Sequence, residues 1–230
     1  MSTIRAVLFD LDNTLVDFIF MKEQSCRAAA GAMVATGLLM DESLAYEELI
    51  KTYFAVGIES DHAFSEFLKS KGQFNHKILA AAINAYLDAK NRCLKPYANV
   101  KPVLEELERK GIFIAMVTDA PKTKAYQRLL AMKIEPYFRF VVGYEDTNNL
   151  KNTGLPLKLV LQFLRKELPG IANSEILMVG DSIERDVAPA KQLGLKTAWA
   201  KYGQKTSTPS TADYELADIK DLLNIVKRWP

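Results

Sequence analysis

The sequence predicts an α/β fold built on a mainly parallel β-sheet with a helical insertion. Short apolar runs of β-type composition alternate with helical patterns along most of the chain. These runs are apolar throughout, which is typical of parallel strands that are covered by helices on both faces. One long stretch, residues 17–95, breaks the alternation because it contains helical patterns only.

Five short runs have the composition of buried strands, and they lie at residues 6–9, 112–118, 138–143, 175–181 and 196–200. Helical segments with clear ends separate them. Segment 99–111 has Asn99 and Pro102 at its front and Gly111 after its end, and a predicted strand follows directly. This order of elements supports the parallel sheet.

The helical stretch reads as several consecutive helices, for instance over residues 41–57 and 76–94. We therefore expect two domains. Residues 1–16 and 96–230 form the sheet domain, and residues 17–95 form an all-helical domain inserted after the first strand.

The composition and charge of the chain argue against some classes of partner. The chain has 230 residues, 49% of them hydrophobic and 25% charged, and its net charge of +2 comes from 30 basic and 28 acidic residues. No basic field is expected, which argues against nucleic acid and membrane surfaces as partners. Only two cysteines are present, Cys26 and Cys93, and neither has metal-ligand or disulfide-framework spacing, so we expect a reducing, cytoplasmic setting.

No segment reaches eighteen uninterrupted apolar residues, so neither a signal peptide nor a membrane span is expected. The polar stretch 203–213 predicts a flexible loop. Whether the chain is a monomer or a homodimer stays open.

The first predicted strand raises a chemical question, because the run "VLFDLDNTLV" ends it with Asp10 and Asp12. In an extended chain, residues i and i+2 project to the same side, so both acids would face one small volume. Such a pair persists if a cation neutralises it, if one acid stays protonated, or if water screens both charges.

Two further predicted strands also end in polar residues. In an open parallel sheet, ligands bind beyond the carboxyl ends of the strands, where "VTDAPK" and "VGDSIERD" follow their strands. One sheet edge is thus expected to carry six polar side chains: Asp10, Asp12, Thr118, Asp119, Asp181 and Asp186. Each one alone is ordinary turn or capping chemistry, but converging carboxylates call for a hard divalent cation, with Mg²⁺ as the first candidate.

Together these motifs resemble the signatures of the haloacid dehalogenase-like hydrolases. "DLDNT" resembles the first, Thr118 of "VTDAPK" is similar to the second, and "GDSIERD" resembles the last. The third, a lysine ahead of a helix, is the poorest match. Lys151 precedes Pro156, which is expected to open the helix, and Lys158 one turn into that helix is the alternative. The resemblance implies a Rossmann-like three-layer core with a helical cap domain inserted after the first strand.

The resemblance also implies a phosphatase that acts on a small phosphorylated metabolite. Asp10 would be the nucleophile and Asp12 the general acid and base, and an Asp at the second position favours phosphate ester over carbon–halogen chemistry. Mg²⁺ would be held by the carboxylates of Asp10 and Asp181 and by the backbone carbonyl of Asp12. Thr118 with its neighbouring amides would bind phosphoryl oxygens, and Lys151 would offset negative charge.

The remaining polar positions are implied less directly. Asp186 would orient a metal-bound water or the lysine. Asp119 stands beside the substrate position, where the family often has Asn, and an acid there would repel phosphate unless it points away or meets a base such as Lys122. For Asn13 and Ser182, a local turn role and a site role stay open.

Two other functions remain as alternatives. A phosphomutase of the same family would show the same four signatures, and a non-catalytic phosphate-binding or interaction module is the third possibility. Intact Asp10, Asp12 and Asp181 favour an enzyme.

His62 and His76 have no partners at metal-ligand spacing, so we interpret them as surface or cap residues. Because the insertion leaves the sheet just after Asp12, we expect it to act as a lid that sets substrate specificity.

Overall fold

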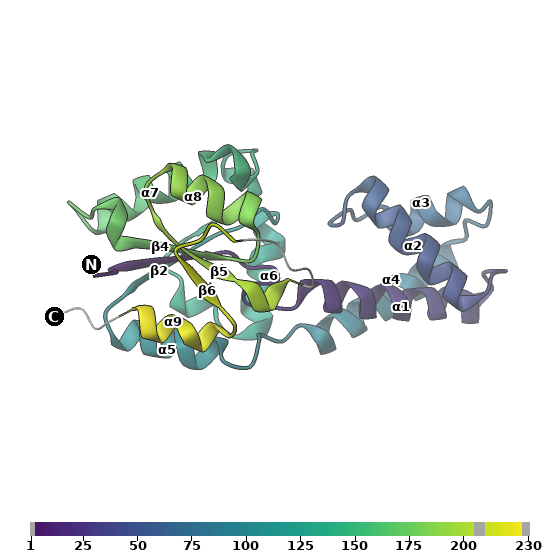
Figure 1. The fold of residues 1–230 in the computed structure, drawn as a ribbon. Coiled ribbons are helices and arrows are strands. Elements are labelled where there is room, and N and C mark those ends of the chain that lie inside the picture. The colour runs from purple at the N-terminus through teal and green to yellow at the C-terminus, as the bar shows by residue number, and fades with distance from the viewer. Residues whose placement is uncertain (1–2, 205–209, 227–230) are drawn as a thin grey trace. The chain divides into compact units, whose positions relative to one another are not determined.

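The computed structural model describes residues 3–204 and 210–226 (Figure 1). They form a six-stranded sheet of order β3-β2-β1-β4-β5-β6 in which every neighbouring pair is parallel. The strands are β1 Ala6–Phe9, β2 Phe113–Val117, β3 Val141–Val142, β4 Ile176–Gly180, β5 Lys196–Ala200 and β6 Tyr214–Leu216. The predicted α/β class with a mainly parallel sheet is confirmed.

Helices cover both faces of the sheet, as Figure 1 shows. One face carries α7 and α8 and the other carries α5 and α9; their bounds are α5 Val100–Arg109, α7 Leu155–Glu167, α8 Ala188–Gln192 and α9 Leu222–Ile225. Leu8 and Met178 of the two central strands pack with Leu157 and Val160 of α7 in one buried cluster. All residues of β1 and β4 are buried, because the strands are enclosed from both sides, and this explains their uninterrupted apolar sequences.

Two strands at the edges differ from expectation. Only Val141–Val142 of the predicted strand 138–143 is a regular strand, although Arg139 and Phe140 still exchange backbone hydrogen bonds with β2. Strand β6 was not expected. Of its three residues only Leu216 is buried, since an edge strand is covered less completely, and it therefore lacks the apolar run that marks central strands.

Residues 18–94 form a separate compact helical unit, and the rest of the chain forms the other unit. Its helices are α1 Phe18–Thr36, α2 Glu42–Val56, α3 Ala63–Ser70 and α4 His76–Cys93. The side chains of Asp41 and Asn75 accept hydrogen bonds from the first free N–H groups of α2 and α4, which fixes where these helices begin. A buried cluster that includes Met33, Leu49 and Phe67 gives this unit its own core.

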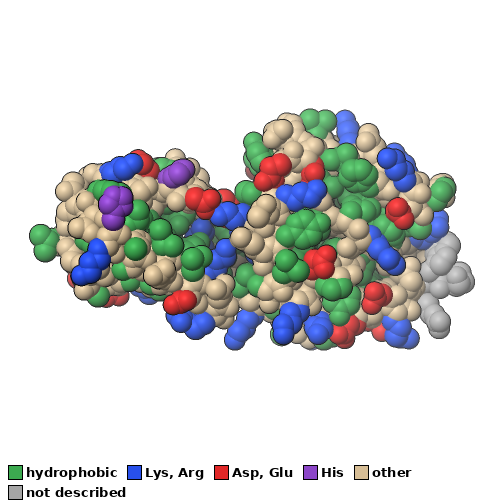
Figure 2. Space-filling view, turned by 180° about the vertical axis from the view of Figure 1, so that it is seen from behind, with side chains coloured by type: hydrophobic (Ala, Val, Ile, Leu, Met, Phe, Trp, Pro, Cys, Tyr) green, Lys and Arg blue, Asp and Glu red, His purple; other side chains and the backbone are tan. Residues whose placement is uncertain are grey.

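Lys and Arg side chains are interspersed with Asp and Glu on the face shown in Figure 2. Both histidines are exposed and appear there in purple on the helical unit. Cys26 is buried, Cys93 is partly buried, and both are free thiols. Within the described ranges, no helix combines the length and apolarity needed to cross a bilayer. Residues 205–209 of the predicted loop 203–213 lie outside the described residues.

Candidate active site

The site begins at the carboxyl end of the central strand β1. The backbone N–H of Asp10 donates to the carbonyl of Val179 at 2.9 Å, which continues the ladder between β1 and β4. Thr14 Oγ1 donates to Asp10 Oδ2 at 3.2 Å, and both side chains are buried. Asn13 has a φ of 59°, a left-handed conformation that Asn tolerates better than most residues, so it takes a turn role in the backbone between these two groups.

The lysine at the site is carried by a short turn ahead of α7. Residues Lys151–Thr153 form a 3-10 turn, and Pro156 occupies the first turn of α7, as the sequence predicts. Gly154 joins the two with a φ of 74°, where a glycine avoids backbone strain. Lys151 is 2% exposed, whereas Lys158 is exposed on the helix. The turn therefore brings Lys151, and not Lys158, into the protein interior.

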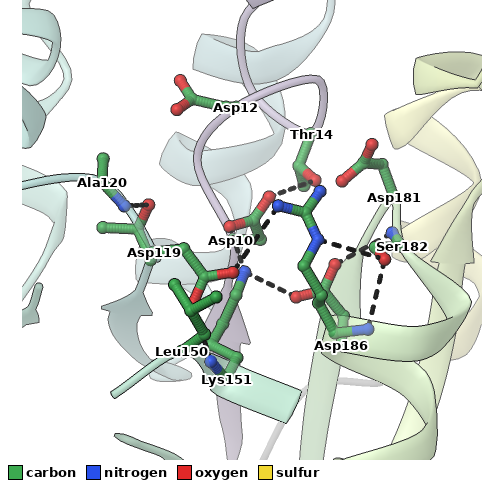
Figure 3. A network of polar contacts seen from close by, with 12 residues as sticks. Asp10, Asp12, Thr14, Asp119, Ala120, Leu150, Lys151, Asp181, Ser182 and Asp186 are labelled. Carbon is green, nitrogen blue, oxygen red and sulfur yellow. Dashed lines mark hydrogen bonds and ion pairs between the residues drawn. The ribbon is translucent and has the colours of Figure 1, made fainter. Parts of the chain in front are cut away.

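Lys151 links two of the acids (Figure 3). Its Nζ donates to a carboxylate oxygen of Asp10 and lies 2.6 Å from Asp186 Oδ1. Burial lowers the pKa of Lys151, but the charges of Asp10, Asp186 and Asp119 outweigh burial and raise it above its usual range. The ammonium therefore stays charged, and it is the fixed cation of the site.

Three carboxylates converge at this point. Ligand atoms of Asp10, Asp181 and Asp186 all lie within 4.8 Å of one another, and all three residues are buried. Burial first, and then the charges of Asp10 and Asp186, raise the pKa of Asp181 to about 8. Among the described residues, Asp181 Oδ1 is buried and accepts no hydrogen bond. A hard divalent cation with oxygen ligands fits this group, because it would neutralise the excess charge and engage that oxygen.

Asp181 is held in place by two residues that the sequence did not single out. Trp199 Nε1 donates to the backbone carbonyl of Asp181 at 2.7 Å, and Gln204 Nε2 donates to its Oδ2 at 2.6 Å. Gly203 passes so close to the loop after β1 that an added Cβ would lie 1.7 Å from the carbonyl oxygen of Asn13. Only glycine fits there, and the segment after β5 thereby reaches the site.

Asp186 is fixed by the turn after β4. The backbone N–H of Ser182 donates to Asp186 Oδ2 at 2.9 Å, and Ser182 Oγ accepts from the N–H of Arg185 at 3.1 Å. A Cβ added at Gly180 would lie 2.3 Å from Asp186 Cγ, so glycine at that position leaves room for the carboxyl group. Ser182 thus takes the local turn role, while Asp186 contacts the lysine directly.

Asp119 pairs with a basic side chain, but this is Arg185 and not Lys122, the base that the sequence suggested. Its Oδ1 accepts from the backbone N–H of Lys151 at 2.7 Å, and its Oδ2 lies 3.6 Å from Arg185 Nη1. Lys122 instead pairs with Asp146 at 2.8 Å. Burial lowers the pKa of Arg185, but the charges of the surrounding acids outweigh burial and raise it. Arg185 was missed because nothing in "GDSIERD" distinguishes it from a solvated arginine.

Thr118 follows β2, the strand next to β1 in the sheet. Its backbone N–H donates to Val142 at 2.9 Å, and its Oγ1 accepts from the N–H of Ala120 at 3.2 Å. The register of β1 and β2 pairs Phe9 with Met116, so the ends of both strands reach the same edge. Thr118 is buried at that edge.

Asp12 lies outside the group of three acids, and Figure 3 shows it apart from Asp10. Its Oδ2 accepts from Arg128 Nη1 at 3.0 Å, and the Arg128 side chain is 1% exposed. Arg128 belongs to α6, Lys122–Met132, whose other buried residues include Ala125 and Met132. Ala125 lies three residues before Arg128 and Met132 four residues after it, and this helical spacing is the sequence signal for a buried arginine.

Comparisons with known proteins show the family of the chain. Residues 7–200 match the model of the haloacid dehalogenase-like hydrolases, and the chain belongs to this family. It is 28% identical to the glyceraldehyde 3-phosphate phosphatase of Pyrococcus furiosus, over 99% of this chain and 95% of that protein. It is 26% identical to the phosphoglycolate phosphatase of Aquifex aeolicus, over 96% of both chains.

A solved structure shows the same fold. The chain superposes on an HAD phosphatase from Thermococcus onnurineus with a TM-score of 0.71 at 23% identity, covering 98% of this chain and all of that one. The predicted family resemblance is therefore confirmed, and the chain is a member of a hydrolase family.

Proposed function

We propose that this protein is a Mg²⁺-dependent phosphatase that hydrolyses a small phosphate monoester through a phosphoaspartyl intermediate on Asp10. The observation that carries the proposal is the position of Asp10 between a buried ammonium, Lys151, and two further carboxylates, Asp181 and Asp186. A carboxylate in direct contact with a buried ammonium, at the carboxyl edge of a parallel sheet, is suited to attack phosphorus.

In the first step, an oxygen of Asp10 attacks the phosphorus atom in line with the ester oxygen. The P–O bond to the leaving group breaks as the bond to Asp10 forms, and Asp12 gives its proton to the leaving oxygen. Lys151 offsets the negative charge of the nucleophile and of the transferring group. Thr118 and the adjacent backbone amides would bind the phosphoryl oxygens.

In the second step, water hydrolyses the acyl phosphate. Asp12, now ionised, takes a proton from the attacking water, the bond between phosphorus and the Asp10 oxygen breaks, and inorganic phosphate and free Asp10 result. The two steps together convert ester and water into alcohol and phosphate, and Asp12 ends in its starting protonation state.

Asp10 and Asp181, with the backbone carbonyl of Asp12, would hold the cation. When bound, Mg²⁺ supplies the positive charge that lets a phosphate dianion approach these acids. Asp186 lies in the same group of carboxylates, and its contact with Lys151 supports a role in orienting the lysine. The pair formed by Asp119 and Arg185 brings a second cation to the site and removes the repulsion expected from an acid at position 119.

The names of the relatives suggest small phosphorylated metabolites as substrates, with glyceraldehyde 3-phosphate first and phosphoglycolate second. We propose that residues 17–95 act as the cap domain that selects among them, and that residues 1–16 and 96–230 perform the chemistry. The support is positional: α1 begins at Phe18, shortly after Asp12, and α4 ends at Cys93, ahead of the return to the sheet.

Phosphate release from a panel of phosphorylated metabolites and p-nitrophenyl phosphate, with and without Mg²⁺, tests the proposal. We expect release of inorganic phosphate that needs Mg²⁺ and stops in excess EDTA. A phosphomutase would instead isomerise a sugar phosphate with little net release, and a binding module would do neither. Either of those results overturns the proposal.

A further inference from the structure

We propose that Arg128 is a positioning residue that holds the Asp12 carboxylate on the leaving-group side of the site. This inference rests on the proposed phosphatase function. It concerns a residue outside all four sequence signatures, on helix α6, which follows β2 and whose buried face includes Ala125, Leu129 and Met132.

The burial of Arg128 calls for an explanation. A guanidinium is always charged, and removing it from water is costly unless a partner compensates. Its Nη1 donates to Asp12 Oδ2 at 3.0 Å, so the compensating charge includes the proposed acid and base. An apolar side chain would serve the packing of α6 without that cost, so the charge of Arg128 must be matched by its polar contacts, and the contact with Asp12 is one of them.

The exposure of the two partners is unequal. The Arg128 side chain is 1% exposed, whereas the Asp12 side chain is 23% exposed. The arginine therefore approaches Asp12 from the protein interior and leaves it reachable from the solvent side, where a substrate must arrive.

The location of Asp12 fits its proposed task. The leaving oxygen stands opposite the nucleophile in an in-line displacement, so its proton donor must lie away from Asp10 by about the width of a phosphoryl group. Asp12 lies outside the group formed by Asp10, Asp181 and Asp186. Arg128 is the buried anchor that keeps this carboxylate from turning toward the cation site or into solvent.

The dependence of the rate on the leaving group distinguishes a positioning role of Arg128 from simple structural support. A nitrophenolate leaves without a proton at neutral pH, whereas the alkoxide of a metabolite ester needs one. Arg128→Met should therefore lower kcat/KM, which reports the leaving-group step and not the later hydrolysis shared by both substrates, about 10–100-fold for the alkyl ester glycerol 3-phosphate and much less for p-nitrophenyl phosphate. Arg128→Lys, which keeps a charge, should fall between Met and wild type. Lys122→Met removes a cation from the same helix without touching Asp12 and should leave the ratio of the two rates unchanged.

A double-variant cycle with Asp12→Asn completes the test. If Arg128 acts through Asp12, adding Arg128→Met to Asp12→Asn should change kcat by less than about twofold, because the two residues act as a unit. Equal losses on both substrates, or full additivity in the cycle, overturn the inference. If Arg128→Met does not fold, the rate ratio of Arg128→Lys decides. A wild-type enzyme without phosphatase activity, or an Asp12→Asn variant with full activity, would instead refute the proposed function.

Discussion

Lys151 Nζ bridges the carboxylates of Asp10 and Asp186, at 2.6 Å from the latter, inside a protein whose sequence separates the three residues widely. The bridge depends on the turn before α7, which buries the lysine, and on Gly180, which leaves space for Asp186. It places a permanent positive charge against the proposed nucleophile.

The lysine gives the first prediction. Lys151→Ala should lower kcat by roughly 10²–10³-fold, the usual cost of removing a group that stabilises the transition state electrostatically. Lys158→Ala is the matched control, since that side chain is exposed on α7, and it should keep nearly full activity. Steady-state kinetics with p-nitrophenyl phosphate measure both variants. The reverse ranking would assign the catalytic lysine to position 158.

The fit of a cation predicts stabilisation by Mg²⁺. Binding to the native state alone raises the unfolding temperature, so millimolar Mg²⁺ should raise the Tm of the wild type in a thermal scan. Asp181→Asn removes one of the three converging carboxylates and should reduce that shift, while also relieving repulsion in the metal-free protein. An unchanged Mg²⁺ response in this variant would place the cation elsewhere.

Close packing at Gly180 gives a prediction about stability. Gly180→Ala inserts a Cβ that would meet Asp186, and overpacking of this kind typically costs about 1–3 kcal/mol. We expect a lower midpoint in urea unfolding together with a loss of activity, since the new methyl group displaces Asp186 from Lys151. At Gly170, outside the strands, an added Cβ would meet nothing within 4 Å and φ is 79°, so Gly170→Ala shows the cost of backbone strain without a clash. Retained activity in a well-folded Gly180→Ala protein would argue against the role of Asp186.

The two thiols should differ in reactivity. Burial raises the pKa of Cys26 to about 12, whereas Cys93 is only partly buried. At pH 8 the thiolate fraction of Cys26 is therefore on the order of 10⁻⁴, and only the thiolate is nucleophilic. We expect alkylation of native protein to label Cys93 first, with Cys26 reacting on unfolding. Mass spectrometry of the labelled peptides reads the order, and fast labelling of Cys26 would contradict the packing of the helical unit.

Central features of the fold were predictable because buried parallel strands are continuous apolar runs. The positions of Asp10, Thr118 and Asp181 at one edge of the sheet were predictable as well, because residues that follow parallel neighbouring strands reach the same edge. Strand β6 was not predictable from its composition, because an edge strand is only partly covered and carries no such run.

The supporting contacts of the site could not be read from the sequence. Arg128 and Gln204 reach Asp12 and Asp181 from elements far away along the chain, and no local pattern encodes such a meeting. Arg185 lies within a signature, yet its partner Asp119 belongs to another strand end. Side-chain pairing across elements is a property of the folded chain.

The covalent intermediate is the most direct test of the central claim. The protein is mixed with Mg²⁺ and a rapidly turned-over phosphate ester, quenched in acid within milliseconds, digested, and analysed by mass spectrometry. We predict one added phosphoryl group on the peptide that contains Asp10, at Asp10 itself, and neither label nor turnover in a folded Asp10→Asn variant. Turnover without a labelled Asp10, together with activity in Asp10→Asn, would contradict the assignment of the nucleophile.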